Sequence, residues 1–350
     1  MSKTLATAPA VDGVGVAVQI ASSAVVIGWP SFGEGSLLSE GAIVRASGRG
    51  VSIGTGSAVI ENCVVVGTPA MPISIGRRTT FGHRCLVIGA TVGDLCEIGN
   101  ASILMPEARL GDRVFLGEGT LVPPGMELPS DVVAVGRPAR VIRAVSAADL
   151  DRLRGLRGGD LSLPPHTSTV VEPALEGLAM GQLYGYHGIM PTIADSAVLF
   201  PTAEITGDVV IGQGTIIGAG VKIIGDSHGP VRIGNDVQIL ENTVLHLLPD
   251  NELVIDDGAT IGPGAMIHGC HIGPATVVEP GAIVCDGSVV GANCVVRAGA
   301  VVKQRSRFGD GVEIDGFPAA EIGRIVPPQR PAWALQLDDL PTHSAGGERR

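Results

Sequence analysis

The amino-acid sequence predicts an all-β solenoid of two tandem left-handed parallel β-helix domains with six-residue repeats. Apolar residues recur every six positions, which is neither the period of two of a strand nor the 3.6 of a helix. Aromatic residues make up only 3% of the 350 residues while glycine numbers 51, which suits stacked aliphatic side chains with tight corners. The stretch from Glu61 to Gly93 recurs 180 residues later, from Glu241 to Gly273.

The first predicted domain covers residues 16–140. Its apolar anchors begin near Ile20, are spaced by six within each run, and include one step of five. They are Phe32, Leu38 and Val44; Ile53, Val59 and Val65; Ile75, Phe81 and Val87; and Val92, Ile98, Leu104, Leu110, Leu116, Val122 and Leu128. Each hexad is expected to form a short strand and a turn, and three hexads one triangular coil. Since no single coil buries its own face, the stack must be long and capped.

A helix and a connector are predicted over residues 141–190. The periodicity stops near Ala139, and the sequence RVIRAVSAADLDRLRGLRGG is typical of a helix with Ser146 as its N-cap. The connector contains the run GQLYGYHG, and it forms either a linker that straps the domains or a lid over a site.

The second predicted domain covers residues 191–325. Its anchors are Ile193, Ile205, Ile211, Ile217 and Ile223; Ile233, Ile239 and Leu245; Ile255, Ile261 and Ile267; and Ile272, Val278, Val284, Val290, Val296 and Val302. Its step of five matches that of the first domain, and GRPA at 136–139 is matched by GFPA at 316–319. The pattern indicates an internal duplication. Residues 326–350 are predicted to form a C-terminal strap and tail.

Net charge, apolar segments and cysteine spacing indicate which binding partners and which cellular compartment to expect. The net charge of −11 disfavours nucleic acid and anionic membranes, which attract basic patches. No segment has the length of a membrane span, and the N-terminus lacks the apolar core of a secretory signal. The six cysteines form no CxxC pair and mostly occupy apolar positions, so we expect reduced thiols in a cytoplasmic protein.

Histidines are distributed in a complementary way between the two copies. His246 corresponds to Val66, and His268 corresponds to Ile88. Conversely, His83 in the first copy corresponds to a proline, Pro263, in the second.

The second copy contains the motif N-x-V-x-H, then T-I-G-x-G-A-x-I-H-G-C, then hexads that end in G-x-P-A. This series resembles the γ-class carbonic anhydrases of the hexapeptide-repeat superfamily, over about residues 25–145 and 195–325. In that family each β-helix has the shape of a three-sided prism, and three histidines hold zinc or iron between neighbouring prisms. Two of the histidines come from one prism and the third from the next. The resemblance therefore implies His246 and His268 as same-prism ligands and His83 as the neighbour's ligand.

One Zn²⁺ or Fe²⁺ per chain is then expected if the two copies combine their ligands. Three protein nitrogens and an open fourth position are typical of a catalytic zinc site, where the metal lowers the pKa of bound water to about 7. The resemblance implies that metal-bound hydroxide attacks CO2 or an activated carbonyl such as a thioester. The alternative is that both copies are decaying and the histidines are remnants.

Other residues of the family's site are only partly present. In the family, the Arg and Asp of an Arg-Gly-Asp segment form a salt bridge between prisms. The first copy keeps Arg45 and the second, with one inserted residue, has Asp226, so the resemblance implies an Arg45–Asp226 pair. Its glutamine is replaced by Ile60 and Leu240, and the acidic residue beside it becomes Glu61 or Glu241. Glu241 is a candidate proton acceptor or a solvated turn carboxylate.

The remaining histidines are weaker candidates. His271 could replace a missing ligand or lie at a solvated corner, and His228 could line the pocket. His166, His187 and His343 carry no signal.

The family's three-prism rings imply self-association. A ring of one kind of prism contains no complete triad, whereas a mixed ring or a pair of prisms within one chain does.

Three functions follow from these features. The first is a metal-dependent lyase or hydrolase that acts on a small-molecule substrate. The second is a hexapeptide acyltransferase that uses acyl-CoA, with His83 as general base. The third is a non-catalytic scaffold or assembly subunit.

Overall fold

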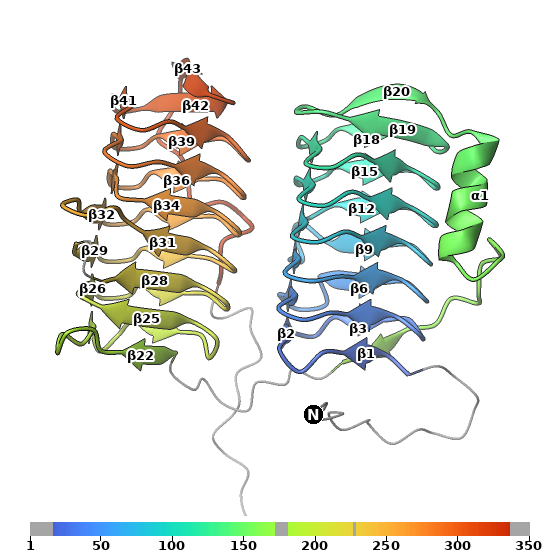
Figure 1. The fold of residues 1–350 in the computed structure, drawn as a ribbon, viewed down its shortest axis with the longest axis horizontal. Coiled ribbons are helices and arrows are strands. Elements are labelled where there is room, and N and C mark those ends of the chain that lie inside the picture. Colours follow the sequence, from blue (N-terminus) through green and yellow to red (C-terminus); the bar gives the residue numbers. More distant parts are fainter. Residues whose placement is uncertain (1–16, 172–180, 227–228, 337–350) are drawn as a thin grey trace, which may run out of the picture. The chain divides into compact units, whose positions relative to one another are not determined.

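The computed structural model describes residues 17–171, 181–226 and 229–336. Its contacts divide the chain into unit 1, residues 1–177 with 336–350, and unit 2, residues 178–335. Each unit is a parallel β-helix with its own aliphatic core, and the predicted fold class is confirmed. Figure 1 shows the stacked rungs, each of which contributes one strand to each of three sheets.

Unit 1 contains three sheets whose neighbouring strands come from successive coils. The first is formed by β1 (Gln19–Ile20), β4 (Leu37–Leu38), β7 (Ala58–Val59), β10 (Thr80–Phe81), β13 (Glu97–Ile98), β16 (Phe115–Leu116), β19 (Val132–Val135) and β20 (Arg140–Ala144). The second is formed by β2 (Val25–Gly28), β5 (Ile43–Ala46), β8 (Val64–Gly67), β11 (Leu86–Ile88), β14 (Ile103–Leu104) and β17 (Leu121–Val122). The third is formed by β3 (Ser31–Phe32), β6 (Val51–Ile53), β9 (Ile73–Ile75), β12 (Thr91–Val92), β15 (Arg109–Leu110), β18 (Glu127–Leu128) and β21 (Thr169–Val170).

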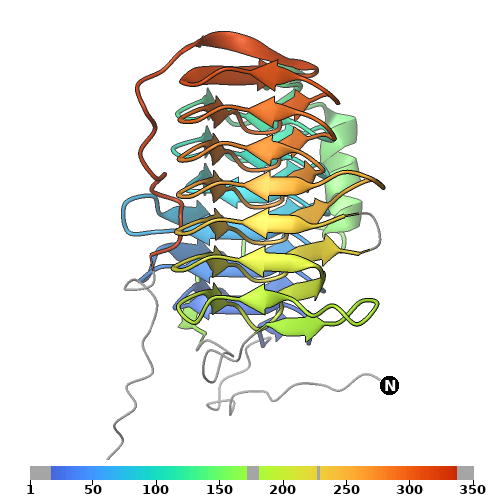
Figure 2. The ribbon, with the colours of Figure 1, turned by 90° about the vertical axis from the view of Figure 1, so that its left-hand side faces the viewer.

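Unit 2 repeats this arrangement, as Figure 2 shows from another side. Its first sheet is formed by β22 (Gln182–Tyr184), β25 (Glu204–Gly207), β28 (Lys222–Gly225), β31 (Val244–His246), β34 (Met266–His268), β37 (Ile283–Val284) and β40 (Val301–Val302). Its second is formed by β23 (Thr192–Ile193), β26 (Val209–Ile211), β29 (Val231–Ile233), β32 (Leu253–Ile255), β35 (His271–Ile272), β38 (Val289–Val290) and β41 (Arg307–Phe308). Its third is formed by β24 (Val198–Leu199), β27 (Ile216–Ile217), β30 (Gln238–Ile239), β33 (Thr260–Ile261), β36 (Val277–Val278), β39 (Val295–Val296), β42 (Val312–Gly316) and β43 (Ala319–Arg324).

The six-residue anchors form the two cores. All the anchors from Phe32 to Leu128, and all those from Ile205 to Val302, are buried. They stack in register: Leu245 pairs with Ile223 on one side and Ile267 on the other. Because successive side chains of a strand point to opposite faces, an inward anchor directs the next residue outward. This alternation places His246 and His268 on the outer face.

An antiparallel strand closes each stack and corrects one expectation. We predicted a helix from near residue 139, but residues 140–144 form β20, which pairs with β19. Val141 and Ile142 favour an extended strand that covers the last rung. The helix α1 spans Ala147–Leu156 and is capped by Ser146 with Asp149, as expected.

The helix and the following segment pack on unit 1. Leu153 of α1 is buried, and Arg157 donates hydrogen bonds to the backbone oxygen of Arg78 and the hydroxyl of Thr80. Farther on, β21 pairs antiparallel with β3. Residues 158–171 thus strap the outside of unit 1, whereas β22 already belongs to the first sheet of unit 2.

The cysteines were expected to be reduced thiols, and the C-terminal segment was expected to form a strap. All six cysteines are free thiols, and burial raises the pKa of Cys96 to about 12, which keeps its thiol protonated. Before residue 337, Trp333 and Leu335 are buried, and Leu335 exchanges two backbone hydrogen bonds with the Gln238 amide. No described helix is long and apolar enough to span a bilayer.

The core predicts a large stability difference between two isoleucines of unit 1. Ile75 stacks between Ile53 and Val92 and is 2% exposed, whereas Ile142 is 57% exposed. We expect Ile75→Ala to lower the free energy of unfolding by about 2–5 kcal/mol and Ile142→Ala by about 0.5 kcal/mol or less. Urea denaturation followed by circular dichroism measures both. Equal losses would contradict the assignment of the core.

Candidate functional site

The clearest polar arrangement of unit 2 is a pair of histidines on its first sheet. His246 ends β31 and His268 ends β34, and the two residues are in direct register. His246 Nδ1 lies 3.0 Å from His268 Nε2, and the ring centroids are 5.1 Å apart. Neighbouring parallel strands hold these two side chains together.

A carboxylate fixes the orientation of His268. Its Nδ1 lies 2.5 Å from Asp286 Oδ2, and the Asp286 side chain is only 13% exposed. A carboxylate accepts hydrogen bonds, so the network assigns the proton of His268 to Nδ1 and a lone pair to Nε2. With this tautomer, Nδ1 of His246 donates a hydrogen bond to that lone pair. Two imidazole nitrogens therefore face each other across a short gap.

Asp286 is itself held by the loop that follows His246. Its Oδ1 accepts hydrogen bonds of 3.3 Å from the Leu248 amide and from the side chain of Asn251. The Asn251 amide also donates to the backbone oxygen of Gly269 at 2.7 Å. Our sequence analysis missed Asp286. The available signal was its position 18 residues after His268, which is one full coil of three hexads.

Asp226 approaches the opposite side of His246. Its Oδ2 lies 3.9 Å from His246 Nε2, which is longer than a hydrogen bond but close enough for charge attraction. Between β5 and β28 the strands are offset by 179 residues, whereas between β6 and β29 the offset is 180. The extra residue of unit 2 thus follows β28, and Asp226 corresponds to Ser47.

The predicted acidic neighbours of the site differ between the units. Glu241 lies at the corner before β31, where its side chain is buried and its backbone oxygen accepts from the Gly264 amide at 2.8 Å. In unit 1, Glu61 Oε2 lies 2.8 Å from His83 Nδ1, and the side chains are 41% and 54% exposed. His83 is thus oriented by a carboxylate through the same ring nitrogen as His268.

Unit 1 has apolar residues where unit 2 has its histidine pair. Val66 and Ile88 are in register, and both are buried. Arg45 is the neighbour of Val66 on β5, and its side chain is also buried. The structure therefore brings together Asp226, His246 and His268 in unit 2, and Glu61 with His83 in unit 1. The predicted pairs Arg45 with Asp226, and His83 with the other histidines, join different units and stay predictions.

His271 does not extend this site. His271 Nε2 lies 2.7 Å from Asp256 Oδ2 on another sheet of unit 2, and both side chains are partly exposed. His228 and His343 lie outside the described residues. Across residues 17–171, 181–226 and 229–336, no group of three or more His, Cys, Asp or Glu is arranged to hold a metal.

Parts of the chain are similar to known proteins. A family model for the bacterial transferase hexapeptide (six repeats) matches residues 269–304. A carbonic anhydrase of Geobacillus kaustophilus is 40% identical over 104 residues, which cover 30% of this chain and 57% of that protein. The mitochondrial γ-carbonic anhydrase 1 of Arabidopsis thaliana is 35% identical over 141 residues, covering 39% and 51% respectively.

The chain is a γ-carbonic anhydrase-like hexapeptide-repeat protein. It spans about half the length of the carbonic anhydrases that it matches. The carnitine operon protein CaiE of Escherichia coli is 29% identical over 142 residues, covering 41% of this chain and 72% of CaiE. A solved hexapeptide transferase family protein from Anaplasma phagocytophilum is 29% identical, covers 41% of this chain and 85% of its own, and has a TM-score of 0.40.

The histidine network of this γ-carbonic anhydrase-like chain predicts a defined tautomer. In metal-free protein we expect His268 to be protonated at Nδ1, because Asp286 accepts that proton. Two-bond ¹⁵N–¹H correlation spectra of histidine-labelled protein, assigned with His268→Ala, report the tautomer. Asp286→Ala should shift His268 towards the Nε2-protonated form. A wild-type His268 protonated at Nε2 alone would contradict the arrangement.

Proposed function

We propose that this protein is a γ-carbonic anhydrase-like metalloprotein whose single metal site is shared between the two kinds of unit. His246 and His268 would be two ligands and His83 the third. The observation that carries the proposal is the facing pair of ring nitrogens in unit 2, with the tautomer of His268 set by Asp286. His83, oriented by Glu61, supplies the type of donor that this pair lacks.

The geometry of the pair fits a metal. Two nitrogens that each lie about 2.0–2.1 Å from zinc in a tetrahedral site are about 3.3 Å apart. The observed separation of 3.0 Å needs only a small adjustment. Metal-ligating histidines usually donate their other ring N–H to a carboxylate, which fixes the ring and raises its basicity. His268 with Asp286 and His83 with Glu61 both show this contact.

The bound metal would lower the pKa of a bound water to about 7 and provide a nucleophile at neutral pH. The remaining chemistry belongs to the protein. Asp286 and Glu61 orient His268 and His83, and Asp226 supports His246 through charge. Ile60 and Leu240 replace the family's glutamine, so the substrate is oriented without that amide. The substrate would be CO2 or an activated carbonyl, and Glu241 remains the candidate proton acceptor.

The complete site requires His83 from a unit of the first kind beside a unit of the second kind. Hexapeptide-repeat β-helices commonly assemble as trimers, so this pairing would form either within one chain or in a mixed ring of chains. Tandem units in one chain ensure that the two kinds are made in equal number.

A second candidate function is acyl transfer from an acyl-CoA. The His83–Glu61 pair favours it, because an exposed imidazole whose Nδ1 faces a carboxylate is also the arrangement of a general base. A non-catalytic scaffold is the third candidate. Metal content distinguishes the three candidates.

We expect purified protein to bind about one zinc or iron per chain, as measured by plasma emission spectrometry. His83→Ala, His246→Ala and His268→Ala should each lose this metal, because two nitrogens hold zinc far more weakly than three. His271→Ala is the matched control and should retain it, since His271 lies on another sheet. Absence of metal together with CoA-ester binding would favour acyl transfer, and absence of both would favour a scaffold.

Asp286→Asn should weaken zinc binding by about 10–100-fold without abolishing it, because the variant keeps all three nitrogens and loses only the charge that orients His268. Competition with a chromophoric chelator measures the affinity. Asp256→Asn, which changes the carboxylate beside His271, should bind zinc like the wild type. Equal affinities for Asp286→Asn and the wild type would exclude this role for Asp286.

A further inference from the structure

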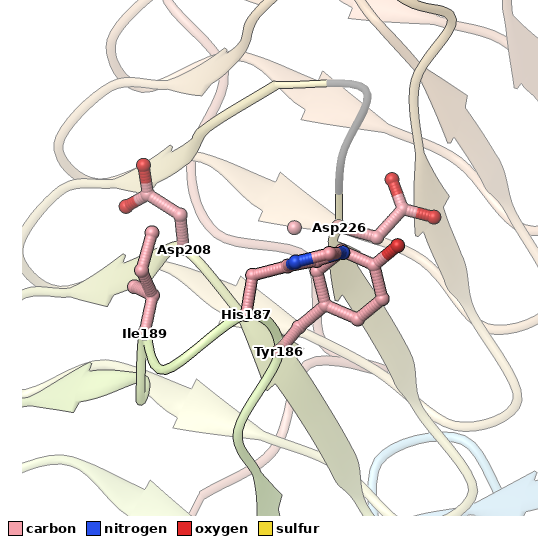
Figure 3. A pocket seen from close by; sticks show the side chains of 6 residues that line it. Tyr186, His187, Ile189, Asp208 and Asp226 are labelled. Atoms are coloured by element: carbon pink, nitrogen blue, oxygen red, sulfur yellow. The ribbon is translucent and has the colours of Figure 1, made fainter.

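A cavity lies beside the histidine pair of unit 2, and Asp226 is the one residue of its lining that the proposed metal site also uses. It has a volume of about 270 Å³ and is lined by Tyr186, His187, Ile189, Asp208, Gly225 and Asp226. Figure 3 shows the rings of Tyr186 and His187 on the side nearer Asp226, with Ile189 and Asp208 on the other side. Asp226 connects the cavity to the site, because its Oδ2 is 3.9 Å from His246 Nε2.

Part of the cavity wall is a tight β-hairpin, in the segment that the sequence analysis predicted to be a connector. The backbones of Tyr186 and Ile189 exchange two hydrogen bonds of 2.9 Å. Between them, His187 has φ +48° and Gly188 φ +80°, the signs of a type I′ turn, which matches the twist of the flanking strands. The turn brings the Tyr186 and His187 rings into edge contact, with centroids 4.3 Å apart.

The base of the hairpin fits against a site that accepts only glycine. Gly207 has φ +77°, and a Cβ on it would lie 2.0 Å from the Gly225 oxygen and 3.2 Å from Tyr186 Cβ. Gly207 and Gly225 are also in direct register. The absence of side chains here lets the aromatic residue approach the sheet and leaves the space beside it open.

The cavity offers apolar contacts more than free charge. Asp208 is paired with Arg232, whose guanidinium nitrogens lie 2.7 and 3.1 Å from its two carboxylate oxygens. The Tyr186 ring, the Ile189 side chain and the Gly225 backbone provide apolar surface, and His187 and Asp226 complete the lining. Since pockets for drug-sized ligands measure about 300–1,000 Å³, this one suits a short apolar group. CO2 has no such group to place there.

We propose that this cavity binds the non-reacting acyl part of a short-chain acyl thioester or ester, whose carbonyl then lies toward His246 and His268. This inference rests on the proposed metal site and names its substrate class. In the hydrolysis that it implies, the oxygen of water bonds to the acyl carbon and the carbon–sulfur bond breaks. One proton of water goes to the thiol and the other to the carboxylic acid. Apolar contacts to the acyl chain position the carbonyl for attack.

The first test measures binding separately from turnover. The probe is S-butyryl-N-acetylcysteamine, titrated with saturation-transfer NMR on the butyryl methyl group. We expect binding to wild type and to His246→Ala alike, because the histidine contributes to the metal site and not to the cavity. Tyr186→Ala should bind about tenfold more weakly through loss of apolar contact area.

Two further variants make the result specific. Tyr184→Ala is the matched control, since Tyr184 lies two residues away, is 44% exposed and does not line the cavity. It should bind the probe like the wild type. Ile189→Ala removes apolar surface from the side of the cavity that faces Tyr186 and should also weaken binding of the probe. This second variant keeps the test valid if Tyr186→Ala fails to fold.

The outcomes separate this inference from the metal site. Probe binding that is lost in Tyr186→Ala or Ile189→Ala, in a protein that holds no metal, supports the cavity and contradicts the metal. Metal-loaded protein that hydrates CO2 but does not bind the probe overturns the cavity and leaves the metal site intact. Equal binding by wild type, Tyr186→Ala and Ile189→Ala also overturns it.

Discussion

The stacking of coils in register is the constraint on which the rest of the structure depends. Neighbouring parallel strands are about 4.8 Å apart, so any two outward residues in the same column of adjacent coils are within contact distance. His246 and His268 are 22 residues apart in sequence, yet the register of β31 and β34 brings their ring nitrogens to 3.0 Å. The buried column of Ile223, Leu245 and Ile267 maintains that register, because a slip of one residue would turn the anchors outward. Core packing thus positions the chemistry.

The two units use one scaffold differently. Unit 2 has the histidine pair and the carboxylate of Asp286, whereas unit 1 has the buried residues Val66 and Ile88 at the same positions. Conversely, His83 with Glu61 stands in unit 1 where unit 2 has Pro263. A duplicated β-helix tolerates this division because each column position is structurally equivalent from coil to coil. If both units take part in one metal site, each unit can lack the histidines that the other unit supplies.

Periodic features of the structure were predictable from the sequence, and non-periodic ones were not. The six-residue spacing identified the buried anchors, including the step of five between Val87 and Val92. The segment that forms β20 was wrongly predicted to be helical, because the sequence RVIRAV does not alternate between apolar and polar residues. Its strand conformation comes from antiparallel pairing with β19 at the end of the stack. Asp286 stands one coil after His268, but the apolar anchors alone do not show that its side chain reaches the imidazole. The hairpin of Tyr186 and Ile189 lies outside the hexads, which therefore do not determine its path.

The central claim is that three imidazoles, one from unit 1 and two from unit 2, hold one metal. X-ray absorption spectroscopy at the zinc edge tests it most directly, because multiple scattering from imidazole rings counts histidine ligands. Zinc-loaded wild-type protein should show three imidazoles at about 2.0–2.1 Å. His83→Ala, which binds zinc only weakly, should show two imidazoles in the fraction that a large excess of zinc still loads. A wild-type spectrum with no imidazole scattering, or one that His83→Ala leaves unchanged, would contradict the shared site.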